Sequence, residues 1–291
     1  MVFSGEQNPN RGQQLAMESA PVLQLEDLVV AYPGATDPTI DGLTLSLQRG
    51  ERLALVGPSG CGKSTVARAV LGLLPEGSRS QGRLELLGTD PRRLRRSALN
   101  RLRGEAVGLV FQDPMTRLNP LISIGDHLRD TLTAHGAQAA RAEELLQRVG
   151  IGPERFNSYP HQFSGGMRQR VAIARTLAAD PEILLMDEPF GALDALTREH
   201  LQTKLMEINR AARKTTIFVT HDVEEAILIA HRLVIFSARP ARVLEDIDIS
   251  AKLGDMRAQE IRDTPTFLEL RRHVQAVIRA EYARAMGAAH V

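Results

Sequence analysis

The fold of this chain is decided by the stretch Gly57-Pro58-Ser59-Gly60-Cys61-Gly62-Lys63-Ser64, which fits the pattern G-x-x-x-x-G-K-[ST] at every fixed position. A short apolar run, residues 52–56, precedes it, and a helical pattern through Leu74 follows it. Glycines let backbone N–H groups turn inward around phosphate oxygens, and the positive end of the following helix stabilises the anion. The stretch therefore predicts a phosphate-binding loop between a strand and a helix.

Two side chains at the end of this loop have expected roles toward a nucleotide. Lys63 is expected to reach the β- and γ-phosphates, and the Ser64 hydroxyl is expected to ligate Mg²⁺. Cys61 is the one cysteine of the chain, and its small side chain is expected to pack rather than to act as a nucleophile.

Short apolar runs recur along the chain and are separated by helical patterns, which is typical of a parallel sheet buried on both faces. Besides 52–56, they are 107–111, 183–186 and 216–219. Residues 28–32 and 43–47 read as further strands, the second with clear alternation. Between 111 and 183 no strong strand signal occurs, and helices are expected at 141–149 and 167–179. The prediction is an α/β core with a helical insertion.

Polar side chains follow three of these apolar runs. In open α/β sheets, ligands bind outside the carboxyl ends of the strands, so these side chains are expected to meet at one nucleotide. Asp187 is the expected Mg²⁺ partner, and Glu188 faces differently because side chains alternate along an extended segment. Glu188 is therefore the candidate to polarise the attacking water. His221 is placed to hydrogen-bond the γ-phosphate, and Gln112 to touch Mg²⁺ or the water.

A second glycine pair lies far from the first loop in the sequence. Ser164 is a plausible N-cap, and Gly165 and Gly166 would expose N–H groups at the positive end of the helix that follows. Such a pair could also be only a tight turn. In combination with the first loop it predicts a second anion-binding segment.

Composition limits the class of protein. The 291 residues are 43% hydrophobic and 24% charged, as in ordinary globular proteins, and allow one large domain or two small ones. A net charge of +1 gives no support to nucleic-acid binding by bulk charge. A single cysteine excludes an internal disulfide and fits a reducing compartment. No stretch reaches the ~18 apolar residues of a membrane span, so we expect a soluble intracellular protein.

Taken together, these motifs resemble the ATP-binding subunit of an ABC transporter over roughly residues 22–245. Residues 57–64 resemble the Walker A loop, Gln112 the Q-loop, residues 164–167 the signature motif, and residues 183–188 the Walker B strand. Residues 192–194 resemble the D-loop, and His221 the switch histidine. The remaining positions that match nucleotide-binding residues of the family are Tyr32, expected to stack on adenine, Thr65 at the end of the Walker A motif, and Asp194 of the D-loop.

The resemblance implies a P-loop nucleotide hydrolase with a RecA-like core, an antiparallel β subdomain and a helical insertion at about 114–179. It implies a nucleotide-binding domain at 21–245, between a flexible tail at 1–20 and a C-terminal helical appendix at 246–291. The implied activity is Mg²⁺-dependent ATP hydrolysis. Two ATPase subunits would pair head to tail, with each ATP between the Walker A loop of one and the Ser164 segment of the other.

The implied partners are integral membrane permease subunits and a solute-binding protein, with no nucleic acid, and the implied place is the cytoplasmic face of the inner membrane. Residues 112–120 and 159–163 are similar to oligopeptide or nickel importer subunits. Residues 189–194 and 237–240 are more similar to nitrate, sulfonate or taurine importer subunits, which we favour. A soluble ABC-type ATPase is a third possibility, but such chains usually carry long coiled-coil insertions or two motif sets.

Overall fold

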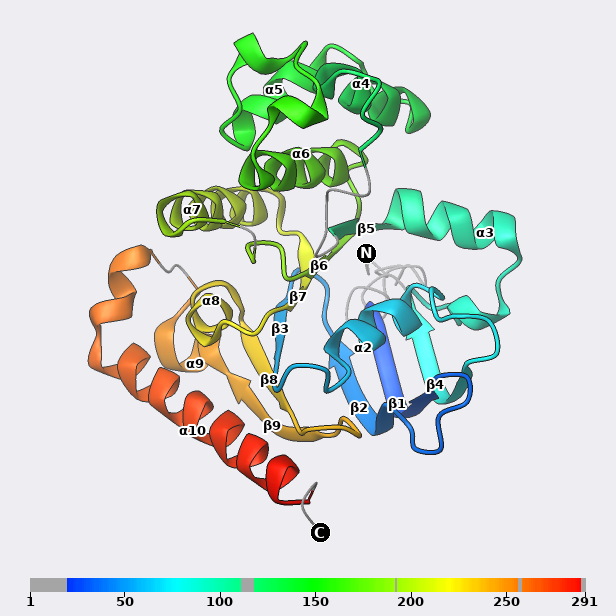
Figure 1. Cartoon of the computed structure of the whole chain (residues 1–291), viewed down its shortest axis with the longest axis vertical. Helices are drawn as coiled ribbons and strands as arrows, with labels where there is room; N and C mark the ends of the chain where they lie inside the picture. The colour runs from blue at the N-terminus through cyan, green and yellow to red at the C-terminus, as the bar shows by residue number, and fades with distance from the viewer. Residues whose placement is uncertain (1–19, 111–117, 192, 256–257, 289–291) are drawn as a thin grey trace, which may run out of the picture.

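The computed structural model describes residues 20–110, 118–191, 193–255 and 258–288. Its larger sheet has six strands in the order β5-β6-β7-β3-β8-β9, and Figure 1 shows it at the centre of the molecule. The first five are parallel, and β9 is antiparallel to β8. The strands span Val107–Val110 (β5), Ile183–Asp187 (β6), Thr215–Val219 (β7), Arg52–Val56 (β3), Arg232–Phe236 (β8) and Val243–Asp248 (β9).

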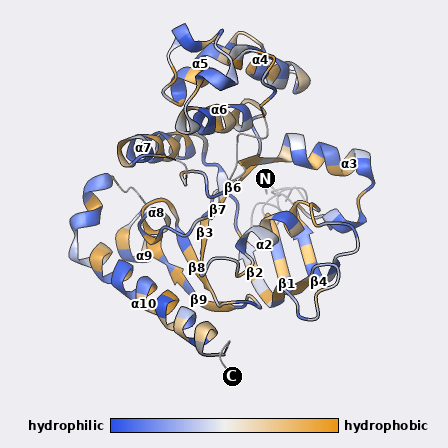
Figure 2. Ribbon diagram, in the orientation of Figure 1, coloured by the Kyte–Doolittle hydropathy of each residue, from blue (hydrophilic) through white to orange (hydrophobic). Residues whose placement is uncertain are grey.

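The apolar runs form central strands because both faces of this sheet are buried. Side chains alternate along each strand, so β3 sends Ala54 and Val56 into one hydrophobic cluster and Leu53 and Leu55 into the other. Figure 2 shows the corresponding orange band across the sheet. The polar groups that follow these strands are thereby held at one edge of a rigid core.

A smaller antiparallel sheet packs beside the second cluster. Its order is β2-β1-β4, with β1 at Leu23–Ala31, β2 at Ile40–Leu47 and β4 at Arg79–Leu86. Leu25 of β1 lies opposite Leu45 on one side and Leu84 on the other. Helix α2 (Lys63–Val70) lies between the two sheets and ends four residues earlier than expected, because Gly72 has φ +60° in the turn after it.

The helices of the insertion lie together in the upper part of Figure 1. They are α4 (Ile124–Ala134), α5 (Arg141–Arg148) and α6 (Gly165–Ala178). Helices α7 (Ala195–Ala212) and α8 (Val223–Ile229) follow β6 and β7, and α3 (Arg96–Arg101) precedes β5. No helix among the described residues combines the length and apolar character needed to cross a bilayer.

The C-terminal part differs from the expected boundary at residue 246. Strand β9 continues to Asp248, because it pairs with β8 along its whole length, and the helical part begins only with α9 at Ile249–Leu253. The long helix α10 (Pro265–Ala288) then crosses the molecule. Its apolar side packs on the chain itself, since Phe267, Leu270 and Val274 are buried in the first cluster.

Candidate functional site

The phosphate-binding stretch connects β3 to α2, as expected from the sequence. Gly57 has φ +153°, and a Cβ atom there would lie 2.9 Å from the carbonyl oxygen of Phe236. Gly62 is the N-cap of α2 with φ +127°, and its Cβ would lie 3.2 Å from the Thr39 carbonyl oxygen. Both positions therefore need glycine, for backbone conformation as well as for space.

The side chains of this loop divide into buried and exposed ones. Pro58 and Cys61 face the interior, whereas Ser59 and Gly60 are exposed. Cys61 is only 1% exposed, and burial raises the pKa of its thiol above the usual value. The exposed part of the loop thus consists of Ser59 and Gly60, whose backbone N–H groups suit phosphate recognition.

Lys63 is buried at the start of α2 and folds back over the loop. Its Nζ donates to the carbonyl oxygens of Gly57 and Pro58, both at 2.9 Å. The ammonium group is thus held by two neutral carbonyls of the loop itself. This arrangement suits an anion arriving over the loop.

Ser64 and Asp187 form the second pair of the site. The Ser64 hydroxyl donates to Asp187 Oδ1 at 2.9 Å, joining the first turn of α2 to the end of β6. Burial raises the pKa of the Asp187 carboxyl, which the hydrogen bond from Ser64 partly offsets.

A hydroxyl and a carboxylate at this spacing are the hard oxygen ligands that Mg²⁺ takes in proteins. Among the described residues, no three His, Cys, Asp or Glu side chains gather to hold an ion by themselves. Mg²⁺ suits such a sparse set, because it usually keeps several waters and completes its shell with substrate phosphates.

Glu188 and His221 form the third pair. His221 Nδ1 lies 2.6 Å from Glu188 Oε2, and the Glu188 N–H donates to the Val219 carbonyl at 2.8 Å. Glu188 has φ +50°, a region that non-glycine residues rarely occupy. With this left-handed backbone the Glu188 carboxylate reaches His221, two residues after the end of β7. Backbone strain of this kind is often found at functional sites.

Tyr32 follows β1 and reaches the first turn of α2. Its hydroxyl lies 3.2 Å from Thr65 Oγ1, and Arg68 Nη1 donates to it at 3.5 Å. The ring is thus held beside the phosphate loop by residues of the helix that the loop opens.

The second segment has the local structure that its sequence predicts. Ser164 caps α6 by accepting a hydrogen bond from the Met167 N–H at 3.3 Å. Gly165 faces open space, whereas a Cβ on Gly166 would lie 2.9 Å from Leu193 Cδ2. Asp194 likewise caps α7, and the hydrogen bond from the Thr197 N–H at 3.0 Å lowers the pKa of its carboxyl.

The structure brings together the first loop, Tyr32, Asp187, Glu188 and His221 within one chain. No hydrogen bond between described residues joins the Ser164 segment or Asp194 to the phosphate loop. Gln112 and Ala192 lie outside the described residues.

The motif order of this chain matches a known family. Residues 40–191 match the family model described as ABC transporter. The chain belongs to the ABC transporter family. The resemblance inferred from the motifs is therefore confirmed.

Several curated relatives of this ABC protein are subunits of importers. TauB of Escherichia coli K12, named a taurine import ATP-binding protein, is 36% identical over 263 residues, which cover 87% of this chain and 95% of TauB. DppD of Bacillus subtilis, named for dipeptide transport, is 40% identical, with 75% of this chain and 68% of DppD covered. OppD of Mycobacterium tuberculosis, named for oligopeptide transport, is 38% identical over 82% of this chain, which spans 40% of the length of that OppD.

Solved structures agree with this assignment. The dimeric, post-hydrolysis ATP-binding cassette MJ0796 with ADP and Pi superposes with a TM-score of 0.69 at 29% identity, covering 78% of this chain and 98% of the cassette. The cbiO1 subunit of Clostridium perfringens gives a TM-score of 0.68 at 26% identity, with 79% and 90% covered. These neighbours confirm the predicted fold, a P-loop nucleotide hydrolase, and the class of ABC-type ATPase.

Sequence reasoning missed two groups of residues around the ABC site. Arg198 of α7 donates to the Leu193 carbonyl at 3.2 Å and pairs with Asp222 at 3.4 Å, so it ties the segment before Asp194 to the residue after His221. Tyr282 of α10 accepts a hydrogen bond from the Ser59 N–H at 2.8 Å. Neither contact follows from a periodic pattern, because each joins elements distant in the sequence.

Proposed function

We propose that the chain is the Mg²⁺-dependent ATP-hydrolysing subunit of a solute importer. The observation that carries this proposal is the pairing of Ser64 with Asp187 and of Glu188 with His221, both beside the phosphate loop. A metal-holding pair and a base-holding pair at adjacent strand ends are the parts that hydrolysis of a terminal phosphate needs.

Each residue then has a role. Lys63 and the backbone amides in the outward-facing part of the loop hold the β- and γ-phosphates. The Tyr32 ring stacks on adenine. Ser64 and Asp187, with Gln112, would hold Mg²⁺, which would supply positive charge to stabilise the phosphate groups during hydrolysis.

Glu188 accepts the proton of the attacking water. With Glu188 ionised, the His221 Nδ1–H donates to Glu188 Oε2 and holds the carboxylate in place. Because the two side chains are in contact, a movement of His221 toward the γ-phosphate would also move the Glu188 carboxylate.

The nucleotide site is completed by a second copy or a similar ATPase subunit. Ser164, Gly165, Gly166 and Asp194 sit at the starts of α6 and α7, with Gly165 open to solvent. Helix starts of this kind attract phosphate. In a two-fold pair they would face the phosphate loop of the partner, giving two equivalent sites.

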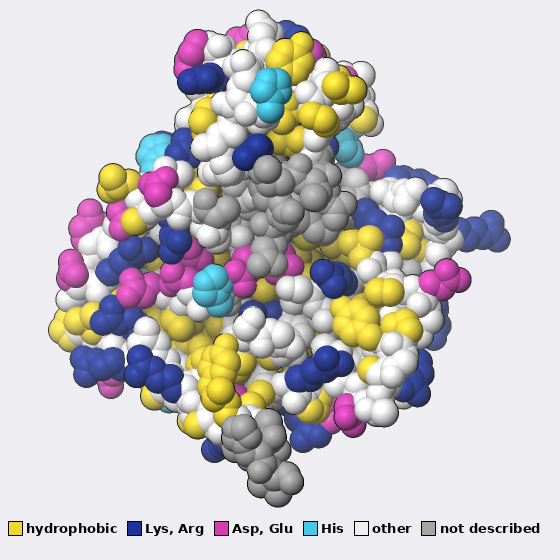
Figure 3. Space-filling model, viewed as in Figure 1, with side chains coloured by type: hydrophobic (Ala, Val, Ile, Leu, Met, Phe, Trp, Pro, Cys, Tyr) yellow, Lys and Arg dark blue, Asp and Glu magenta, His cyan; other side chains and the backbone are white. Residues whose placement is uncertain are grey.

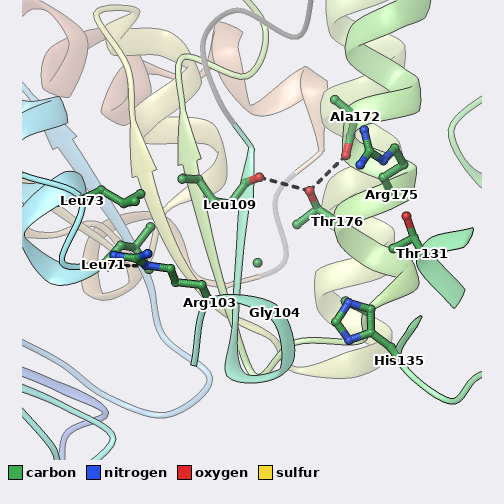
Figure 4. Close-up of a pocket in the computed structure, with 12 residues that line it drawn as sticks. Leu71, Leu73, Arg103, Gly104, Leu109, Thr131, His135, Ala172, Arg175 and Thr176 are labelled. Carbon is green, nitrogen blue, oxygen red and sulfur yellow. Dashed lines mark hydrogen bonds between the residues drawn. The ribbon is translucent and has the colours of Figure 1, made fainter. Parts of the chain in front are cut away.

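A cleft between the helical part and the sheet is the proposed docking place for a permease subunit. It has a volume of about 380 Å³, and its walls include Leu71, Leu109 and Ala172. Figure 4 shows Arg103 and His135 at its rim and Thr176 donating to Leu109 across it. Leu109 belongs to β5, and the neighbouring strand β6 ends at Asp187, so an occupant here would contact a strand beside the nucleotide site.

The cleft is tested with Ala172→Trp, which fills it with a bulky ring. The variant should keep nucleotide affinity but fail to co-purify with integral membrane subunits. Ala139→Trp, exposed in the same helical part, is the matched control and should co-purify normally. Equal co-purification of both variants would disprove the docking place.

The solute is proposed to be a small anion of the sulfonate or nitrate type, handled at the cytoplasmic face of the inner membrane with a solute-binding protein as a further partner. Support comes from the TauB match, which covers 87% of this chain and 95% of TauB. The alternative is an oligopeptide or metal importer, since DppD is 40% identical over a shorter stretch.

One experiment tests the function as a whole. The complex is purified through a tag on this chain, and its membrane subunits, binding protein and bound solute are identified by mass spectrometry. A permease with a sulfonate-bound partner supports the proposal, and a bound peptide selects the alternative. ATP turnover that needs no Mg²⁺, or a complex without membrane proteins, would overturn it.

A further inference from the structure

Helix α10 is fixed to the nucleotide-binding part of the chain. Phe267 and Val274 are fully buried. Arg271 pairs with Glu224 of α8 at 2.7 Å, and His273 with Glu245 of β9 at 2.7 Å. These contacts hold the first half of the helix against the sheet, so the position of its second half is determined as well.

The second half of α10 runs to the phosphate loop. Glu281 accepts a hydrogen bond from the Ala238 N–H at 3.0 Å. The next residue, Tyr282, accepts one from the Ser59 N–H at 2.8 Å, across 223 positions of sequence. The Tyr282 hydroxyl therefore accepts the hydrogen bond of one backbone donor of the phosphate loop, the Ser59 N–H.

The hydrogen bond from Ser59 to Tyr282 is of the same kind as those by which a phosphate loop binds phosphate. A backbone N–H of a phosphate loop donates to a phosphate oxygen, and the phenol oxygen of Tyr282 is an acceptor in the same role. Ser59 is exposed, so this amide is open to an arriving ligand once the phenol leaves. A single hydrogen bond of this kind exchanges readily, because water and phosphate can replace it.

A hollow beside Tyr282 extends from this residue to His221 and Asp222 of the site. The hollow has a volume of about 550 Å³ and is lined by His221 and Asp222 at one side and by Arg279 and Tyr282 of α10 at the other. A tyrosine side chain that leaves Ser59 thus has open space next to it.

The charge of this hollow favours an anion. Its two carboxylates are already paired, Glu224 with Arg271 and Asp222 with Arg198, and both arginines lie outside the lining. Within the described residues, no ion pair engages Arg279, which leaves one positive charge facing the hollow. Figure 3 shows arginine and lysine side chains gathered over the lower left of this face, where Figure 1 draws α10.

We propose that Tyr282 is a residue of the nucleotide site, a placeholder for the terminal phosphate of ATP. In the nucleotide-free chain its hydroxyl takes the Ser59 amide, and a γ-phosphate oxygen displaces it into the hollow. The inference rests on the proposed function, since it needs ATP on this loop. It adds that α10 distinguishes ATP from ADP.

The three tyrosines of the chain allow a direct test by fluorine NMR. The full chain is labelled with 3-fluorotyrosine, and each resonance is assigned with a tyrosine-to-phenylalanine variant. ADP and a non-hydrolysable ATP analogue are then added separately. Tyr32 reports nucleotide binding, Tyr282 reports the terminal phosphate, and Tyr159 in the helical insertion is the reference.

The expected result is a Tyr32 shift with both nucleotides and a Tyr282 shift with the ATP analogue only. A Tyr32 shift with an unmoved Tyr282, or with equal Tyr282 shifts for both nucleotides, overturns the placeholder while leaving the proposed function intact. If no resonance moves, nucleotide binding itself fails, and both proposals fall.

Equilibrium binding gives an independent measurement. Tyr282→Phe removes the competing oxygen, so the affinity for the ATP analogue should rise about three- to tenfold, with ADP affinity unchanged. Tyr159→Phe is the matched control, because Tyr159 is 42% exposed and Tyr282 43%. An unchanged or weakened affinity for the ATP analogue in Tyr282→Phe contradicts the placeholder.

Discussion

His221 Nδ1 lies 2.6 Å from Glu188 Oε2, so the polar groups after β7 and β6 meet in a single contact. The two strands are neighbours in the parallel sheet, and Asp187 lies opposite Val219 in their register. Glu188 has a left-handed backbone, and its side chain contacts His221, whereas Asp187 accepts a hydrogen bond from Ser64. One strand end therefore presents two carboxylates in two different environments.

Glu188→Gln should separate binding from hydrolysis. The amide keeps the size of the side chain but cannot accept the proton of the attacking water, so turnover should fall by about 10²- to 10⁴-fold. Affinity for ATP, measured with a fluorescent analogue, should stay within a factor of about two, because no phosphate-holding group is removed. ATP should also hold the variant as a dimer in size-exclusion chromatography. Unchanged turnover would remove Glu188 from the role of base.

Ser64→Ala should act on the metal. Loss of the hydroxyl that contacts Asp187 should raise the Mg²⁺ concentration for half-maximal ATP hydrolysis about ten- to hundredfold. Excess Mg²⁺ should restore much of the rate. Ser97→Ala, on an exposed position of α3, is the control and should leave the Mg²⁺ dependence as it was. A loss of rate that Mg²⁺ does not rescue would argue for a structural role of Ser64 instead.

Strands β3, β5, β6 and β7 could be predicted because they are short runs of mostly buried apolar residues, whereas the equally apolar β8 is missed. Such strands appear in sequence as uninterrupted apolar runs, and β3 begins and ends where residues 52–56 predict. The loop after β3 can be predicted as well, because the local backbone conformation requires its glycines. Ser164 as a helix cap follows from the same kind of local chemistry.

The two polar edge strands β4 and β9 and the long-range contacts were not visible in the sequence. Strand β4 is missed because only Leu84 and Leu86 of its eight residues are buried, so it carries no apolar run. Strand β9 is likewise polar at the sheet edge, which displaced the expected boundary at 246. The Tyr282 contact with Ser59 depends on the path of α10 across the sheet, and periodicity reports only which face of a helix is apolar.

Gly57→Ala should destabilise the chain through a steric contact. The new Cβ would lie 2.9 Å from the Phe236 carbonyl oxygen, and φ +153° is unfavourable for alanine. We expect a loss of about 2–4 kcal/mol in the free energy of unfolding, measured by urea titration, together with loss of nucleotide binding. Gly34→Ala has φ +74° but open space, and should cost about 1 kcal/mol. Equal losses in the two variants would show that the close contact does not matter.

Cys61 should react slowly with thiol reagents. It is 1% exposed and its pKa is raised by burial, so few thiolates are available at pH 7.5. We expect modification by an aromatic disulfide reagent to be at least about a hundredfold slower in the folded chain than in urea, followed by absorbance. One equivalent should react in urea, as the control for a free thiol. Fast labelling of the folded chain would show that the loop opens readily.

Glu225 should make stability depend on pH. Its carboxyl is 4% exposed, accepts hydrogen bonds from Thr220 at 2.9 Å and Gln202 at 3.2 Å, and has a pKa raised by burial from 4.5 to about 7. Asp222 also raises this pKa, whereas Arg198 lowers it. Between those two pKa values the folded chain holds a proton that the unfolded chain has lost. The free energy of unfolding therefore falls as the pH rises through this window and stays low above it.

Glu225→Gln removes that slope, because the amide is neutral at every pH. Relative to the wild type, the variant should gain about 1–3 kcal/mol in the free energy of unfolding on going from pH 5 to pH 8, measured by urea titration at both values. Glu143→Gln, on an exposed position of α5, should follow the wild type at both pH values. If Glu225→Gln also follows the wild type, the carboxyl is ionised in the folded chain at pH 5, with its charge compensated by Arg198, whose Nε lies 3.8 Å from Glu225 Oε1.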